Sequence, residues 1–179
     1  MIESISRSIS RKIKQSDPEG NVSVEVMEYA IGVKLNLFLT ILLTSLLGLM
    51  TNELYNSLLA LTSFAILRRF SGGLHMKSLT MCAVASSLLF IMIAHIHINN
   101  MAIIILTAIN TVIFLLFSPN TIEEVNPSKL DPYLKLISTL IVLSSLILMS
   151  STVTLAFVAQ GILILPFHKG VNINETITI

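Results

Sequence analysis

The sequence predicts an all-α, polytopic integral membrane protein with about six transmembrane helices and an N-terminal amphipathic helix at the membrane interface. Of its 179 residues, 54% are apolar and 12% are charged, and the mean hydropathy of +0.85 is far above that of a soluble domain. Asp, Glu, Lys and Arg are absent from windows 35–52, 54–67, 78–122 and 136–168. Each window is long enough, or nearly so, for one or two bilayer-spanning helices of about 20 residues.

Composition also excludes several classes of function. The net charge is +1 and the cations are scattered, so the sequence lacks the basic patch that a nucleic-acid binder needs. Cys82 is the single cysteine, which rules out an internal disulfide framework and a zinc site built on paired cysteines. We therefore expect no nucleic acid, no metal and no cofactor.

The N-terminal residues 2–14 have the pattern of an amphipathic helix. Its apolar stripe, at spacings of three and four, consists of Ile2, Ile5, Ile9 and Ile13. The opposite side carries Arg7, Arg11 and Lys14. Such a helix lies among lipid headgroups, and the alternative is a helix packed against the protein's own loops. Residues 17–21 end it, and Ser23 is the expected cap of a second helix that leads into the first span.

The spans follow from the uncharged windows. We expect them at about 35–50, 58–67, 79–98 and 102–117, with Arg68 and Arg69 ending the second. The 31 uncharged residues 136–166 make one overlong helix or two short ones. Two are favoured, since the polar residues 150–152 form a plausible turn.

The cations set the orientation. With six spans and a cytoplasmic N-terminus, all 11 Lys and Arg residues fall on inner segments, as the positive-inside rule requires. The chain is then one membrane domain, 1–179. It comprises cytoplasmic or interfacial helices at 1–33, transmembrane helices at 34–168 and a cytoplasmic tail at 169–179, located in the cell membrane.

The inner loop between the second and third spans is the best candidate for chemistry. Gly72 and Gly73 permit positive φ, and consecutive N–H groups there can form an anion-binding nest. On one continuous helix His75 and Cys82 would lie about 10 Å apart, too far for proton transfer. If Ser78 caps the third span, Cys82 lies near the helix N-terminus, whose dipole favours a thiolate, and His75 can fold back. The alternative is an inert packed cysteine and a solvated histidine.

The spacing of Arg68, Gly73, His75 and Cys82 resembles that of the accessory gene regulator protein B (AgrB) family of Gram-positive bacteria. The resemblance implies a membrane cysteine endopeptidase on the cytoplasmic side that cuts the C-terminal part from a small autoinducer propeptide. It also implies help in cyclising the quorum-sensing signal. Cys82 would be the nucleophile and His75 the base.

The remaining roles and partners stay open at this point. Three roles are open for Arg68: binding a substrate carboxylate, bracing the loop, or serving only as a topogenic charge. Two roles are open for Gly72 and Gly73: binding substrate or structuring the loop. The expected partners are a small membrane-associated propeptide and the lipid bilayer, and a homodimer is left open. The alternative function is a non-catalytic membrane scaffold or exporter for a small peptide.

Overall fold

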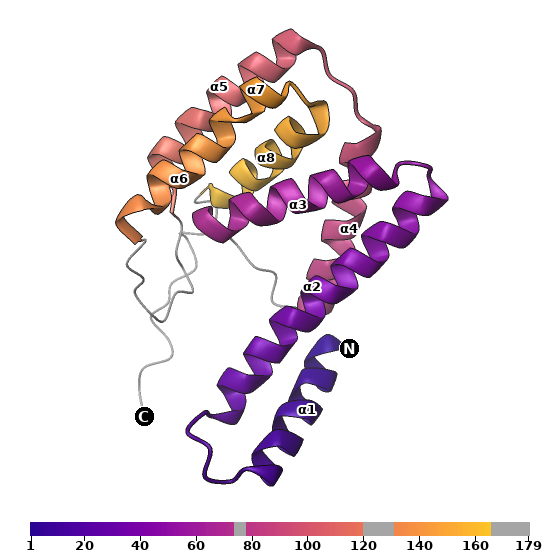
Figure 1. Cartoon of the computed structure of the whole chain (residues 1–179), viewed down its shortest axis with the longest axis vertical. Helices are drawn as coiled ribbons and strands as arrows, with labels where there is room; N and C mark the ends of the chain where they lie inside the picture. The colour runs from indigo at the N-terminus through magenta and orange to yellow at the C-terminus, as the bar shows by residue number, and fades with distance from the viewer. Residues whose placement is uncertain (74–77, 120–130, 166–179) are drawn as a thin grey trace.

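The computed structural model is all-α, without a β-strand, over the residues that it describes: 1–73, 78–119 and 131–165. Its helices are α1 (Ile2–Ser16), α2 (Val24–Met50), α3 (Leu54–Ser71), α4 (Leu79–His95), α5 (Asn100–Phe117), α6 (Asp131–Leu143), α7 (Ser145–Leu148) and α8 (Ser151–Ile164). Figure 1 shows α3 and α5–α8 gathered at one end, while α1 and the first half of α2 project from the other. This confirms the helical class and the order of helices that the hydropathy pattern predicts.

Two apolar clusters hold the helices together, and α3 and α8 contribute to both. The first cluster contains Ala60, Leu61, Phe64, Phe90, Ile93 and Ala156. The second contains Leu67, Phe114, Val142, Val153, Phe157 and Ile164. Phe64 and Phe90 meet edge to face, with ring centroids 5.3 Å apart, a favoured aromatic geometry. The α3–α8 pair is thus the centre of the fold.

The N-terminal helix α1 ends at Ser16, as the 17–21 break predicts, and runs antiparallel beside the first half of α2 (Figure 1). It buries Ser6 and Ser10, whereas Ile5, Ile9 and Ile13 are exposed. Ile2 is 3% exposed, so the expected stripe of four isoleucines is wrong at its first member. The helix therefore packs on α2 through small polar residues and leaves a three-isoleucine face uncovered by the described chain.

The α2 helix begins at the predicted cap, where Ser23 Oγ accepts a 3.3 Å hydrogen bond from Val26 N–H. Its 27 residues form one continuous helix of about 40 Å. Gly32 lies where α1, α2 and α4 meet, since a Cβ there would be 3.6 Å from Ser6 Oγ and 2.7 Å from Leu79 Cδ1. The absence of a side chain lets the three helices approach closely.

The turn after α2 is a Schellman motif. Asn52 has φ 58°, its N–H donates to Leu49 O, and Glu53 N–H donates to Gly48 O at 2.9 Å. The sequence places a turn here correctly, but α3 begins already at Leu54.

The end of α3 corrects a prediction. Arg68 and Arg69 do not end this helix, which continues to Ser71 and stops at Gly72, whose φ is 67° and ψ −145°. Arginine is a good helix former and its charge is favourable in a last turn. The helix therefore ends where Gly72 adopts a backbone conformation that other residues rarely reach, and not where the charged residues lie.

The last apolar block is not one overlong helix, but its described residues form α6, α7 and α8 rather than the two helices that the sequence favours. Met149 has φ 46°, which ends the short α7, and Ser150 caps α8 by accepting from Val153 N–H at 3.5 Å. The break therefore lies at 149–150, just before the predicted turn. The α6 helix, which precedes α7, begins at Asp131, earlier than the expected span.

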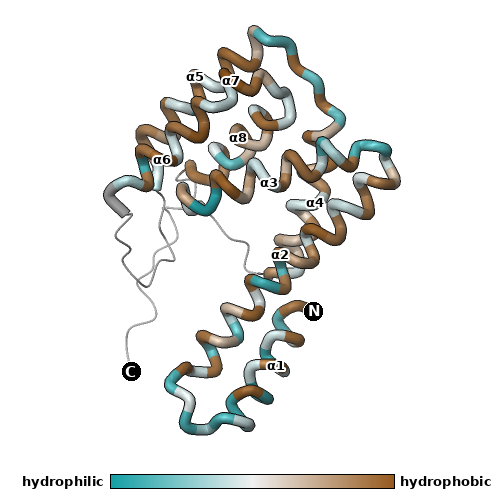
Figure 2. Tube along the Cα trace, viewed as in Figure 1, coloured by the Kyte–Doolittle hydropathy of each residue, from teal (hydrophilic) through white to brown (hydrophobic). Residues whose placement is uncertain are grey.

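The outer surfaces of these helices are apolar. Figure 2 shows hydrophobic residues along the helices and hydrophilic ones mainly at α1 and the connections. Of the described helices, α2 and α5 are long and apolar enough to cross a membrane. Large side chains such as Phe38 of α2 (65%) and Leu116 of α5 (67%) are exposed, a surface suited to lipid rather than water.

Candidate active site

Cys82 lies in the first turn of α4, as the sequence predicts. Ser78 is the N-cap, and its Oγ accepts a 3.4 Å hydrogen bond from Met81 N–H. Cys82 N–H donates the first hydrogen bond of the helix, to Ser78 O at 3.0 Å. The thiol is free and the residue is partly buried. The backbone at Cys82 is therefore fixed by regular helix geometry, while its side chain is not sealed in a core.

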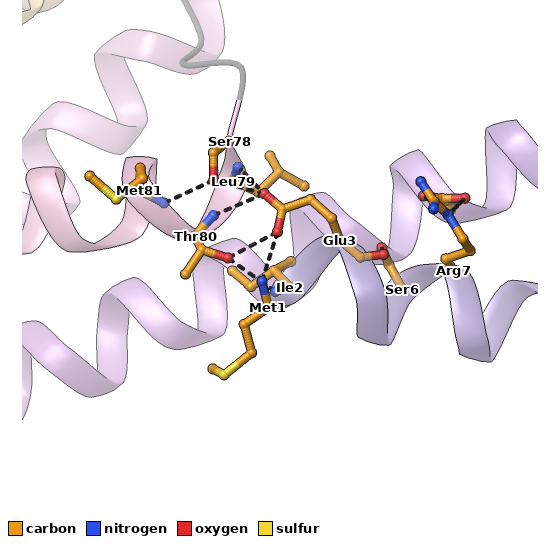
Figure 3. A network of polar contacts seen from close by, with 10 residues as sticks. Met1, Ile2, Glu3, Ser6, Arg7, Ser78, Leu79, Thr80 and Met81 are labelled. Carbon is orange, nitrogen blue, oxygen red and sulfur yellow. Dashed lines mark hydrogen bonds and ion pairs between the residues drawn. The ribbon is translucent and has the colours of Figure 1, made fainter.

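The N-terminus of α4 is occupied by a carboxylate from α1. Figure 3 shows Glu3 reaching the first turn of α4. Its Oε1 accepts from Leu79 N–H at 2.7 Å, from Ser78 Oγ at 3.0 Å and from Thr80 N–H at 3.4 Å. Its Oε2 accepts from Thr80 Oγ1 at 3.0 Å. Glu3 thus satisfies amides that a helix N-terminus otherwise leaves without partners.

These contacts lower the pKa of Glu3 well below its usual range. The largest cause is a backbone hydrogen bond at Glu3, and hydrogen bonds with the Met1 ammonium, Ser78 and Thr80 lower the pKa further, while burial acts in the opposite direction. The sequence argument assigns the positive end of α4 to a Cys82 thiolate. In the structure, the amides there already stabilise the Glu3 carboxylate. Any activation of Cys82 must therefore come chiefly from another group.

The C-terminal end of α3 is held by hydrogen bonds to α8. Gln160, on α8, is fully buried. Its Nε2 donates to Gly72 O at 2.7 Å and to Ser71 Oγ at 2.9 Å. Its Oε1 accepts from Arg68 Nη1 at 3.4 Å. One amide therefore contacts three residues at the C-terminal end of α3.

Arg68 is directed towards this cluster. Besides Gln160, its guanidinium lies over the Phe64 ring, 5.7 Å from the centroid, a cation–π distance. The neighbouring Arg69 is exposed. Of the roles that the sequence leaves open, the contacts of Arg68 fit a brace for the end of α3.

The two glycines have the positive φ that the sequence predicts, 67° at Gly72 and 122° at Gly73. A Cβ at Gly73 would be 3.2 Å from Gln160 Nε2. However, Gly72 N–H donates to Arg68 O at 3.0 Å, so it does not contribute to an anion-binding nest. The glycines thus shape the exit from α3 and allow Gln160 to approach its backbone.

The predicted base, His75, lies outside the described residues, as do its neighbours at 74, 76 and 77. The structure describes both flanks of this segment. Before it, Ser71 and Gly72 are hydrogen-bonded to Gln160. After it, residues 78–80 are hydrogen-bonded to Glu3. Within the described ranges, no group of three or more His, Cys, Asp or Glu residues is arranged to hold a metal ion.

Sequence reasoning missed both Gln160 and Glu3. Gln160 carries a signal that could have been used, because it is the one carboxamide in the uncharged stretch 136–166, and polar groups inside membrane segments tend to be functional. Glu3 carries no such signal. Its role depends on α1 folding back to residues 75 positions away.

Comparison with known proteins relates the chain to a single family. A family model described as Accessory gene regulator B matches residues 2–176. Two AgrB-like proteins of Clostridium perfringens, from strain SM101 / Type A and strain 13 / Type A, are 29% and 30% identical over 93 residues. That stretch is 52% of this chain and 44% of each relative.

An AgrB-like protein of Halalkalibacterium halodurans is 28% identical over 88 residues, 49% of this chain and 45% of that protein. The chain therefore matches less than half the length of these curated relatives. No solved structure matches it significantly.

Proposed function

The chain belongs to the accessory gene regulator B family, and from this premise we propose that it is a membrane-embedded cysteine endopeptidase. Its substrate is a small autoinducer propeptide, whose C-terminal part it removes and whose cyclisation into a quorum-sensing signal it assists. The observation that carries the proposal is the free, partly exposed thiol of Cys82 at the start of α4. In the sequence, Cys82 follows His75 by seven positions.

The reaction begins with proton transfer from the Cys82 thiol to His75. The thiolate attacks the scissile carbonyl of the propeptide, and the C–N bond then breaks. Protonated His75 gives its proton to the leaving amine, so the C-terminal fragment departs with a neutral amine. The N-terminal fragment stays on Cys82 as a thioester.

The thioester retains enough group-transfer potential to acylate a nucleophilic side chain of the same peptide. That nucleophile replaces Cys82 at the carbonyl, which closes a ring and regenerates the thiol. Water would instead release a linear peptide, so a site shielded at the membrane surface favours cyclisation.

The cluster around Arg68 supports the loop in this reaction. Gln160 binds the backbone at Gly72 and the Arg68 guanidinium, which sets where the chain leaves α3 towards His75. Arg68, Gly72 and Gly73 are therefore assigned to loop structure. The apolar face of α1, built from Ile5, Ile9 and Ile13, is assigned to the membrane interface.

We assign six spans, with both ends of the chain in the cytoplasm. The spans are α2, α3, α4, α5, α6–α7 and α8. The support is that this order places all 11 cations on inner segments. The loop that holds His75 and the start of α4 then faces the cytoplasm, where an unprocessed propeptide is available.

The test is cleavage by the purified full chain in lipid. The propeptide is incubated with the wild type, Cys82→Ala and His75→Ala, and products are identified by mass spectrometry. The proposal expects a C-terminal fragment from the wild type and none above background from Cys82→Ala. Binding without cleavage by the wild type would favour a peptide scaffold or exporter instead. Cleavage that persists in Cys82→Ala would overturn the assignment of Cys82 as the nucleophile.

A further inference from the structure

We propose that Glu3 is a positioning residue for the reaction of Cys82, so that α1 is part of the catalytic architecture and not only a contact for substrate or membrane. This inference rests on the proposed function. It starts from a contact between segments that are 75–77 residues apart in the chain.

The contact is built on three consecutive residues of α4. Ser78, Leu79 and Thr80 all donate to the Glu3 carboxylate, through two backbone amides and two hydroxyls (Figure 3). Side-chain hydrogen bonds of this kind fix the first turn of a helix, which otherwise frays. Cys82 lies two residues beyond Thr80, and its own N–H bond runs back to Ser78 O. The turn that Glu3 holds is thus the turn from which the thiol projects.

The backbone of α1 contributes to the same junction. Ile2 N–H donates to Thr80 Oγ1 at 3.0 Å, and the same hydroxyl donates to Glu3 Oε2. Ile2 is buried, and Gly32 leaves room for Leu79 and Ser6 to lie close to α2. The first turn of α1 is therefore bound to α4 by both polar and apolar contacts.

A negative charge suits this position for two reasons. The carboxylate accepts four hydrogen bonds from α4, more than the two lone pairs of a neutral amide oxygen accommodate. It also lies at the positive end of the α4 dipole. Glu3 therefore holds the start of α4 in place, and its effect on the reaction is geometric.

The structure offers a matched control on the same helix. Arg7 Nε and Glu28 Oε1 form a 3.1 Å ion pair between α1 and α2, with Arg7 largely exposed. Glu28→Gln weakens this outer contact and leaves the junction with α4 intact. If α1 acted only by docking beside the bundle, Glu28→Gln and Glu3→Gln would have similar effects.

The experiment measures kcat and KM for propeptide cleavage by the full chain in lipid. Glu3→Ala is expected to lower kcat about tenfold or more, because small misplacements of a reacting group cost that much, with KM changed less than twofold. Glu3→Gln keeps one acceptor oxygen and should recover part of kcat. Glu28→Gln should keep the wild-type kcat.

A second measurement does not depend on cleavage. The alkylation rate of Cys82 by iodoacetamide, without propeptide, should rise in Glu3→Ala as the first turn of α4 loosens, and should stay at the wild-type value in Glu28→Gln. An active, Cys82-dependent wild type together with unchanged kcat in Glu3→Ala, or a change in KM alone, overturns the inference on Glu3. A wild type that does not cleave overturns the proposed function, and the alkylation rates then still report whether Glu3 fixes the turn.

Discussion

Gln160 Nε2 donates a 2.7 Å hydrogen bond to the carbonyl oxygen of Gly72, which joins the last described helix to the end of α3. The bond is partly buried, and its two partners are 88 positions apart in the chain. It makes the backbone at the end of α3 depend on α8, a helix without charged residues. A contact with a helix distant in sequence therefore helps to set where α3 ends.

Replacing Gln160 by Leu should reduce both stability and cleavage. The substitution removes this partner from the partly buried Gly72 carbonyl and from the buried Ser71 hydroxyl. An unsatisfied buried polar group costs about 1–3 kcal/mol. Thr154→Val, on the same helix, is the control, because the buried Thr154 hydroxyl bonds only to Ser150 O within one turn. Thermal unfolding in detergent and the cleavage rate give the two readouts. A fully stable and active Gln160→Leu variant would contradict the role of this bond.

Arg68→Lys should impair cleavage, while Arg69→Lys should not. The planar Arg68 guanidinium reaches Gln160 and lies over Phe64, and a lysine ammonium reproduces neither geometry. Both substitutions keep the positive charge that orients the loop. Equal activity of the two lysine variants would mean that Arg68 acts only as a topogenic charge.

The contact between α1 and α4 should weaken at acidic pH. Because the pKa of Glu3 is lowered in the folded protein, the stability that it contributes is complete above its ordinary value of 4.5 and declines as the pH falls below it. Limited proteolysis of α1, measured from pH 7 to pH 3, should accelerate below about pH 4.5. Glu3→Gln should lose this pH dependence, and a variant that kept it would point to another group.

The isoleucine face of α1 should affect substrate capture rather than the saturated rate. Replacing Ile5, Ile9 and Ile13 by Ser removes up to about 2 kcal/mol of apolar burial per residue from a membrane-bound helix. Ile2 is left in place because it is buried in the protein. KM for the propeptide should rise and kcat should stay close to the wild-type value. A collapse of kcat would assign the isoleucine face to the catalytic framework as well.

The six-span topology predicts a specific labelling pattern. With Cys82 replaced, single cysteines at Asn52 and Asn99 should react with an impermeant reagent outside intact cells. A cysteine at Lys169 should react only after the membrane is opened. Labelling at position 169 from outside would require an odd number of spans.

Much of this fold could be predicted because its causes are local in sequence. Uncharged windows mark the helices, and Ser23 and Ser78 cap α2 and α4 as their hydroxyls suggest. The end of α3 was misplaced at Arg68 and Arg69 because a charge near a helix terminus resembles a stop, whereas Gly72 provides the break.

The contacts around the candidate site were less accessible to sequence analysis. The pairing of Glu3 with Ser78 and of Gln160 with Gly72 depends on how helices pack together across 75 and 88 residues of the chain. No periodicity encodes such pairing. The burial of Ser6 and Ser10 on α1 was also not predicted. Serine normally indicates exposure, but its small side chain also permits two helices to lie close together.

Gly32 makes the spacing at the turn that holds Cys82 depend on α2 as well as on the contact between Glu3 and α4. Even one methyl group at this position would reach within 2.7 Å of Leu79 Cδ1, and Leu79 would have to turn away. Leu79 is also the residue whose N–H donates the shortest hydrogen bond to Glu3. The missing side chain at Gly32 thus allows α2 and α4 to approach each other. A side chain added at this position would displace Leu79, three residues before Cys82.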